Sequence, residues 1–135
     1  MDAKEGLAFV AENHRAVMVT TGSKGKTQTS PITVGSDGER AVISSRETAY
    51  KVRNLERDPN VILCVFTDAF FGPWIQIEGR AEIVHLPDAM ELLENYYRDI
   101  RGEHPSWDEY RQVMRDEKRV LIRIAIDRVG PTKQG

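Results

Sequence analysis

Hydrophobic and polar residues alternate along much of the chain with a period of two, which is typical of half-buried β-strands. The clearest case is the segment 74–84, in which Trp74, Gln76 and every second residue after them face one side. The segment 60–67 is almost continuously apolar and predicts a strand buried on both faces. The remaining strand patterns cover 16–21, 27–34, 40–45 and 119–129. Six strands are therefore expected, with the first three forming a meander.

Helical patterns occupy the rest of the chain. Ser44-Ser45-Arg46-Glu47 matches the Ser-x-x-Glu capping box, so a helix is expected from about residue 45 to Arg57. Ser106-Trp107-Asp108-Glu109 is a second capping box, and helices are also expected at 3–12 and from Pro87 to Gly102. Because strands and helices do not alternate, the pattern favours a mainly antiparallel α+β barrel with peripheral helices over a doubly wound sheet.

Length and charge restrict the function classes. The chain has 135 residues, which suits a single domain over 1–135, and its formal net charge is -2. Basic residues are interleaved with acidic ones, so nucleic acid is not an expected partner. A chain this short buries a modest fraction of its surface, which makes reinforcement by a second copy plausible.

The residue types that build metal and disulfide sites are sparse. Cys64 is the only cysteine, so neither a disulfide framework nor a thiolate metal cluster forms within one chain. The three histidines lie in separate segments without ligand spacing, and no metal site is expected. The start of the chain lacks a signal-peptide pattern, and no apolar run reaches membrane-spanning length. A cytoplasmic protein that is not embedded in a membrane is expected.

Neither a phosphate-binding loop nor a hydrolase nucleophile elbow is expected in this chain. The segment 20–27 ends in Gly-Lys-Thr like a phosphate loop, but Thr20 stands where the first glycine is required and a strand pattern follows. A hairpin turn is the better interpretation. The chain has no Gly-x-Ser-x-Gly elbow, so hydrolase chemistry has little support.

The segment 44–54 carries the residue types that hold a phosphate. Its expected helix start offers free amides, the serines offer hydroxyls, and Lys51 and Arg53 follow within two turns. The alternative is that both cations solvate an outer helix face, and spacing does not decide between the two.

Trp74 and Gln76 share one face of their strand, where an aromatic plate beside an amide suits a flat heteroaromatic ring. The alternative, which spacing alone favours, is a barrel surface packed by a helix or a second subunit. Phe70-Phe71-Gly72-Pro73 is expected to form a hairpin loop whose apolar side chains cover a pocket.

Taken together, these segments resemble the pyridoxamine 5′-phosphate oxidase-like, or FMN-binding split β-barrel, family over nearly the whole chain. Residues 45–59, SRETAYKVRNLERDP, are similar to its strand-helix phosphate segment, and residues 74–81, WIQIEGRA, to its interface strand. Residues 97–120 resemble the actinobacterial branch that uses coenzyme F420. The resemblance implies a six-stranded, Greek-key-like split barrel.

The resemblance also implies a cofactor site that exists only in a homodimer. Lys51, Arg53 and Asn54 would bind the cofactor phosphate or its anionic tail, supported by Ser44 and Ser45. The ring system would run along the second strand, and the other subunit would reach it with two side chains. These residues are Ser30, Pro31, Ile32 and Thr33 of the strand, and Trp74 and Gln76 of the partner.

The implied function is an F420-dependent oxidoreductase that transfers a hydride between the deazaflavin and a small unsaturated organic substrate. FMN is the alternative cofactor, and a non-catalytic carrier of flavin, haem or a tetrapyrrole is the alternative function. No side chain is assigned a catalytic role. The chain ends at 130–135 without the Arg-x-Pro-type segment of true pyridoxamine phosphate oxidases, so that reaction is not expected.

Overall fold

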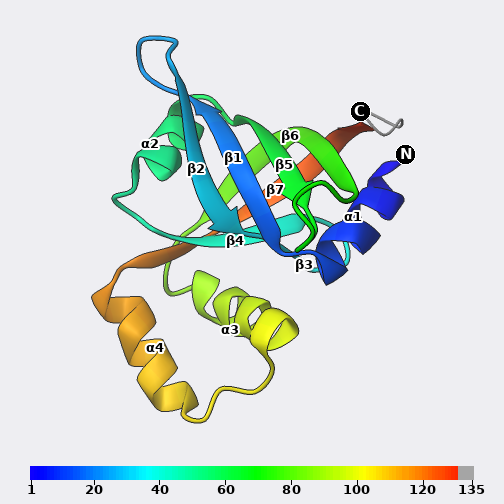
Figure 1. Ribbon diagram of the computed structural model, residues 1–135. Helices are drawn as coiled ribbons and strands as arrows, with labels where there is room; N and C mark the ends of the chain where they lie inside the picture. The colour runs from blue at the N-terminus through cyan, green and yellow to red at the C-terminus, as the bar shows by residue number, and fades with distance from the viewer. Residues whose placement is uncertain (131–135) are drawn as a thin grey trace.

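The computed structural model describes residues 1–130. The expectation that the chain lacks an Arg-x-Pro-type segment concerns residues 130–135, and positions 131–135 lie outside the described residues. Residues 1–130 form a seven-stranded sheet in which every paired strand is antiparallel (Figure 1). The strands are β1 (Arg15–Thr21), β2 (Thr27–Thr33), β3 (Gly35–Ser36), β4 (Ala41–Arg46), β5 (Asn60–Phe66), β6 (Trp74–Val84) and β7 (Arg119–Gly130). The antiparallel α+β class is confirmed, and the strand beyond the six expected is β3, whose two residues are too short to show a period.

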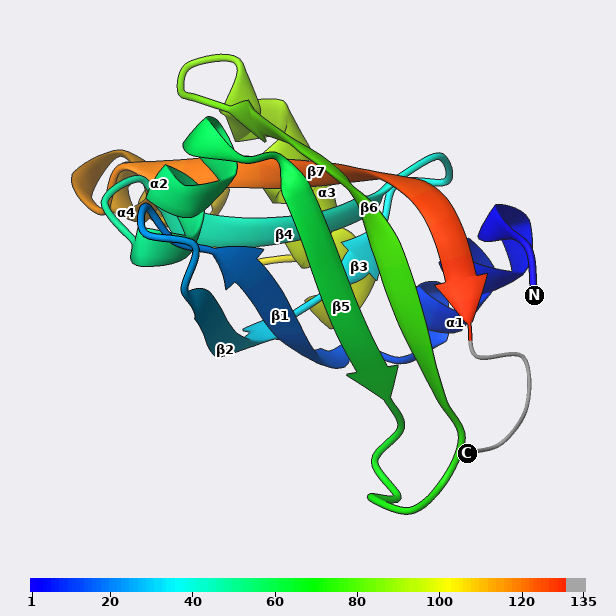
Figure 2. The same cartoon turned by 90° about the horizontal axis from the view of Figure 1, so that it is seen from above.

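The sheet curls into a half-barrel. Its strand order is β2-β1-β5-β6-β7-β4-β3, so β2 and β3 are the two edges, yet Val34 alone separates them in sequence. The two edges therefore meet at this point, and Figure 2 shows the resulting curvature from above. The expected meander is wrong, because β2 pairs with β1 while β4 pairs with β7. Alternation identifies strands, but their partners depend on contacts between distant segments.

Four helices surround the half-barrel within the described chain: α1 (Ala3–Glu12), α2 (Tyr50–Arg57), α3 (Ala89–Arg101) and α4 (Trp107–Asp116). The Ser106 hydroxyl accepts a hydrogen bond from the Glu109 amide at 3.4 Å, which confirms Ser106 as the N-cap of α4 and so one half of the expected capping box. None of the helices in residues 1–130 is both long and apolar enough to cross a membrane.

The predicted capping box at residues 44–47 is wrong. Ser44 and Ser45 lie in β4, where they pair with Leu121 and Val120 of β7, and α2 begins only at Tyr50. The Ser45 hydroxyl donates to the Arg46 carbonyl oxygen at 3.1 Å instead of accepting from a helix amide. Strand pairing therefore extends β4 through the segment that local sequence assigns to a helix start.

The main core fills the inside of the curl, and its fully buried members include Met18, Ile43, Leu63, Ile77 and Ile122. A smaller cluster packs α3 and α4 onto the sheet through Val42, Ala89, Leu93, Tyr110, Met114 and Leu121. The expectation that β5 is buried on both faces is wrong for the single chain. Its residues alternate between buried and half-buried, so the outer face of this strand is apolar yet only partly covered.

Candidate functional site

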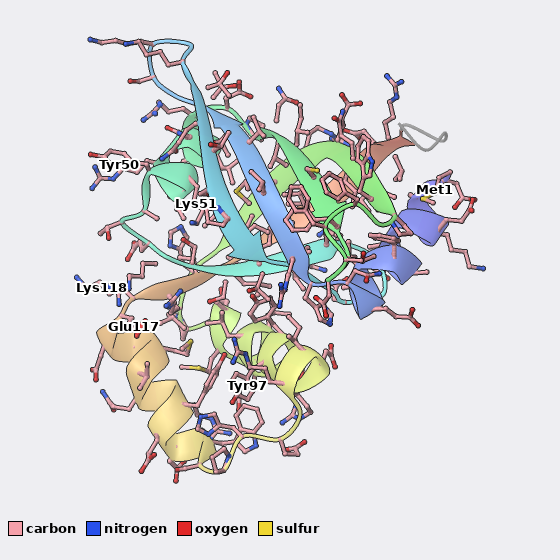
Figure 3. The ribbon with its side chains drawn as sticks, viewed as in Figure 1. Met1, Tyr50, Lys51, Tyr97, Glu117 and Lys118 are labelled. Carbon is pink, nitrogen blue, oxygen red and sulfur yellow. The ribbon has the colours of Figure 1, made fainter. Side chains whose placement is uncertain are left out.

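A groove with a volume of about 540 Å³ lies between the half-barrel and the α3–α4 helix pair. The barrel side consists of residues from β2, β4, α2 and β7, and the helix side consists of residues from α3 and α4. Figure 3 shows Lys51 on the barrel side and Tyr97 on the helix side. The chain therefore reaches this groove from six separate elements, most of them distant in sequence.

Positive charge dominates the groove. Lys51, Arg101 and Arg119 line it, with Glu117 as the carboxylate among the lining residues. Glu117 already binds the guanidinium of Arg119, whose Nε and Nη2 donate to Oε1 at 3.0 and 2.8 Å. Lys51 takes part in no ion pair within the described residues. An anion in the groove would compensate this excess charge.

The pKa of Lys51 also reflects the excess of positive charge in the groove. Burial, and then repulsion by Arg119, lower the pKa of the Lys51 ammonium. A lysine in this situation is stabilised by an arriving anion, because the anion offsets both effects. The groove thus has the charge and the hydrogen-bond donors of a phosphate or carboxylate site.

Tyrosines form the opposite wall. The Tyr96 hydroxyl donates to the carbonyl oxygen of Thr33 at 2.8 Å and so ties α3 to β2. The Tyr110 hydroxyl donates to the carbonyl oxygen of Leu93 at 2.8 Å. Burial is the main cause that raises the pKa of Tyr96 and of Tyr110. Both phenols therefore stay protonated at neutral pH. The Tyr96 hydroxyl holds α3 against the barrel, and the Tyr110 hydroxyl joins α4 to α3.

The structure brings together several of the residues that were predicted from the sequence to bind the cofactor. Ser44 and Lys51 line the groove beside Pro31, Ile32 and Thr33 of the edge strand β2. Ser30 lies on the inner side of β2 and is half-buried, while Ser45 is buried in β4. Neither lines the groove, so any part they play in binding is indirect.

The sequence interpretation missed Arg101, Tyr110, Glu117 and Arg119, all of which line the groove. Tyr96 and Tyr97 were visible as part of an amphipathic helix, but nothing in the local pattern indicates which element that helix faces. Arg119 looks like an ordinary strand end. The pairing of β7 with β4 is what brings Arg119 to the groove, and that pairing cannot be read from the local sequence.

Arg53 and Asn54 do not lie in this groove. They face a second cleft, between α2 and the β1–β2 hairpin. Lys51 and Arg53 are two positions apart, which separates them by about 200° around a helix, so they cannot share a face.

Asn54 is engaged inside the protein. Its Nδ2 donates to Thr20 Oγ1 at 3.1 Å and to Gln28 Oε1 at 2.8 Å, and its Oδ1 accepts from Arg57 Nη2 at 2.7 Å. The side chain is nearly inaccessible, with the residue 5% exposed. Asn54 therefore fixes α2 against β1 and β2 and has no hydrogen-bonding group turned to solvent.

Replacing Asn54 with alanine is expected to lower the free energy of unfolding by about 1–2 kcal/mol, because the buried Thr20 hydroxyl loses its partner. Urea denaturation followed by circular dichroism measures the loss. Asn95→Ala, at an exposed position of α3, is the matched control and should change stability by less than about 0.5 kcal/mol. Equal stability of the two variants would show that the buried network contributes nothing.

Trp74 and Gln76 lie away from the groove of their own chain. In the sheet order β2-β1-β5-β6, the strand that carries them is three positions from β2, or about 14 Å away. The register aligns Thr33, Arg15, Phe66 and Trp74 in one row across the outer face of the sheet. The two residues thus share the outer face with the edge of the groove, at the opposite end of that face.

That outer face is unusually apolar. Half-buried residues occupy its middle, and the β5–β6 hairpin adds Phe70 and Phe71, which are 78% and 97% exposed. The half-buried residues are Val17 and Val19 of β1 and Ile62, Cys64 and Phe66 of β5. Figure 1 looks onto this side of the sheet, and no helix crosses in front of β1, β2 or β5.

Solved structures with the same architecture are numerous. The conserved hypothetical protein Rv2991 from Mycobacterium tuberculosis is 25% identical, with a TM-score of 0.75, over 96% of this chain and 82% of that one. An F420 reductase is 19% identical, with a TM-score of 0.71, over 96% and 98% of the two chains. HutZ, the heme storage protein from Vibrio cholerae, is 17% identical, with a TM-score of 0.72, over 95% and 92%. The last two likenesses establish the fold alone.

The sequence itself matches a family model. The model described as pyridoxamine 5′-phosphate oxidase covers residues 3–133, nearly the full length of the chain. This family includes oxidoreductases, and its fold binds flavin-type cofactors. The family match, the curled antiparallel sheet and the peripheral helices agree, and the chain belongs to the pyridoxamine 5′-phosphate oxidase family, with its split-barrel fold.

Proposed function

We propose that this protein is an oxidoreductase that holds coenzyme F420, or alternatively FMN, with the anionic group of the cofactor in the groove beside Lys51. The cofactor ring, when bound, supplies the hydride that is transferred to a small unsaturated organic substrate. The observation that carries the proposal is the excess of positive charge formed by Lys51, Arg101 and Arg119 in a groove with one carboxylate, which is already engaged. The F420 reductase among the similar folds, and the F420-type pattern of residues 97–120, favour F420 over FMN.

The residues of the groove fit an anionic cofactor. The Lys51 ammonium and the Arg119 guanidinium are donors for phosphate oxygens, and the Ser44 hydroxyl adds a neutral donor at the same wall. Because Lys51 is partly withdrawn from water, its attraction to an anion is stronger than at an exposed site. Binding and orientation are what the protein has to provide, since the ring carries the chemistry.

The ring needs a surface on its other side, and a second copy of the chain supplies one in this proposal. Pro31 and Thr33 border the groove, while Trp74 and Gln76 occupy the far end of the same outer face. Two copies related by a two-fold axis, packed through this face, bring the partner's Trp74 opposite the β2 edge of the first copy. The half-buried apolar residues of β1 and β5 and the exposed Phe70 and Phe71 support burial of this face.

A subunit-mixing experiment tests the shared site. Lys51→Met and Trp74→Ala each damage both sites of a homodimer, whereas a mixed dimer has one site with both residues intact. Mixing equal amounts after subunit exchange should restore about one quarter of the wild-type cofactor sites. The fluorescence of bound cofactor measures the recovery, and each variant mixed with itself is the control. If a mixture with demonstrated exchange shows no recovery, Lys51 of one copy and Trp74 of the other do not serve one site.

Turnover distinguishes an enzyme from a carrier. Purified protein with reduced F420, and separately with reduced FMN, is offered enones, quinones and nitro compounds while cofactor oxidation is followed by absorbance. The proposal expects oxidation that depends on both protein and substrate. HutZ, which has the same fold, is a heme storage protein, and binding of cofactor or haem without substrate-dependent oxidation would assign this chain to a carrier function instead.

A further inference from the structure

A second cleft lies on the other side of α2, where the β1–β2 hairpin approaches the helix. Its volume is about 340 Å³. Figure 1 shows the hairpin extending beyond the sheet next to α2, and Figure 3 shows Tyr50 at the start of the helix. The lining comes from hairpin residues 22–24 and 26–28 and from Tyr50, Arg53, Asn54 and Arg57 of α2.

The residues that line this cleft carry an excess of positive charge. Lys24, Lys26, Arg53 and Arg57 line it, and no carboxylate is among the lining residues. Elsewhere cations are mostly neutralised locally, because nine arginines form ion pairs with Asp or Glu in the described part of the chain. None of the four cations of the cleft is in such a pair within residues 1–130. In a chain with a net charge of -2, these four cations form a local excess of positive charge.

Both elements that carry these cations, the β1–β2 hairpin and α2, are held in place. The guanidinium of Arg57 donates to Asn54 Oδ1 at 2.7 Å, and Asn54 is anchored in turn by Thr20 and Gln28. The hairpin is closed by a hydrogen bond from the Gly22 amide to the Lys26 carbonyl at 2.7 Å. Gly25, with φ 73°, adopts the left-handed conformation that this turn requires. Like charges held close together repel each other, and a bound anion relieves that repulsion.

We propose that this cleft is a binding site for a linear polyanion with several negative charges, of the oligophosphate or oligocarboxylate class. The four cations are distributed over both the hairpin and the helix, so a chain of anionic groups can contact more of them than a single phosphate can. The exposed ring of Tyr50, at 72% exposure, flanks the cleft and leaves it accessible from solvent. The site is separate from the groove beside Lys51, which lies on a different face of α2, and it does not depend on the identity of the cofactor.

Isothermal titration at low ionic strength with tripolyphosphate, tetraglutamate and orthophosphate tests the proposal. At least one of the two polyanions should bind about tenfold more tightly than orthophosphate. The double variant Lys24→Glu/Lys26→Glu should weaken that binding by about tenfold or more. The control Lys4→Glu/Arg115→Glu makes the same change of net charge at exposed positions of α1 and α4 and should have little effect. The relative affinities of tripolyphosphate and tetraglutamate distinguish the phosphate source from the carboxylate source.

The proposal is overturned if orthophosphate binds as tightly as both polyanions, or if the two double variants lose affinity equally. FMN titration of Lys24→Glu/Lys26→Glu provides the second readout. Unchanged FMN affinity together with lost polyanion binding supports two separate sites, whereas a parallel loss of both contradicts them. If wild-type protein binds polyanions but neither flavin nor F420, the proposed function fails while this inference stands.

Discussion

Replacing Lys51 with methionine is expected to weaken cofactor binding by about 1.5–3 kcal/mol, or roughly ten- to hundredfold in Kd. Methionine keeps an apolar stem of similar length and removes only the charged donor. Lys51 lines the groove next to Ser44 and Arg119, so the loss falls on the anionic group of the cofactor. Fluorescence titration with F420 and with FMN measures the change. Arg115→Met, an exposed position of α4, is the control that removes a charge elsewhere.

The same variant should respond in the opposite direction when stability is measured without cofactor. Burial and Arg119 lower the pKa of Lys51, so its charged form destabilises the folded state. The folded state therefore holds this proton less tightly than the unfolded state, and this contribution to stability rises with pH until the ordinary lysine value of 10.5 is passed. Lys51→Met should raise the melting temperature at neutral pH, and the gain should fade toward pH 10.5. If Lys51→Met leaves cofactor affinity unchanged, Lys51 does not bind the anionic group of the cofactor.

Replacing Gly79 with alanine is expected to lower the free energy of unfolding by about 3 kcal/mol. A Cβ atom at Gly79 would collide with the carbonyl oxygen of Ala125 and would lie 2.7 Å from Ile124 Cγ2. The register of β6 and β7 shifts between Glu78 and Gly79, which brings the two backbones close together at this point. Backbone cannot move aside as a flexible side chain can. Urea denaturation measures the loss of stability.

Gly35→Ala is the matched comparison for Gly79→Ala. Gly35 is also buried, but its added Cβ would meet the end of the Ile100 side chain, with Cδ1 at 3.1 Å. That methyl group can turn away, so the expected loss is about 1 kcal/mol or less. Equal losses at the two glycines would show that the approach of β6 and β7 is not what constrains residue 79.

The sequence predicts the elements of this fold better than their arrangement. Alternation places β6 at Trp74–Val84 with the bounds that the structure has, because the period of two extends over eleven residues. The partners of the strands are set by long-range pairing, so the expected meander fails where β4 joins β7. The false capping box at residues 44–47 has the same origin, since pairing with β7 overrides a local helix signal.

The candidate site was predictable to the extent that it is local. The segment around Lys51 was recognised from its residue types, and β2 was expected beside it. Lys51 and Arg53 are two positions apart and lie on different faces of α2, a separation that holds for any helix containing both, including the one expected from about residue 45 to Arg57. Arg119 and the tyrosines of α3 and α4 line the groove because distant segments pack together. No periodic pattern or motif in the sequence predicts that packing.

An equilibrium titration of wild-type protein with F420 and with FMN tests most directly whether the groove beside Lys51 is a flavin-type cofactor site. The expected result is saturable binding of at least one of the two, at one molecule per chain and weakened by Lys51→Met. Absence of binding by both cofactors, in protein whose circular dichroism shows it to be folded, would contradict the proposal.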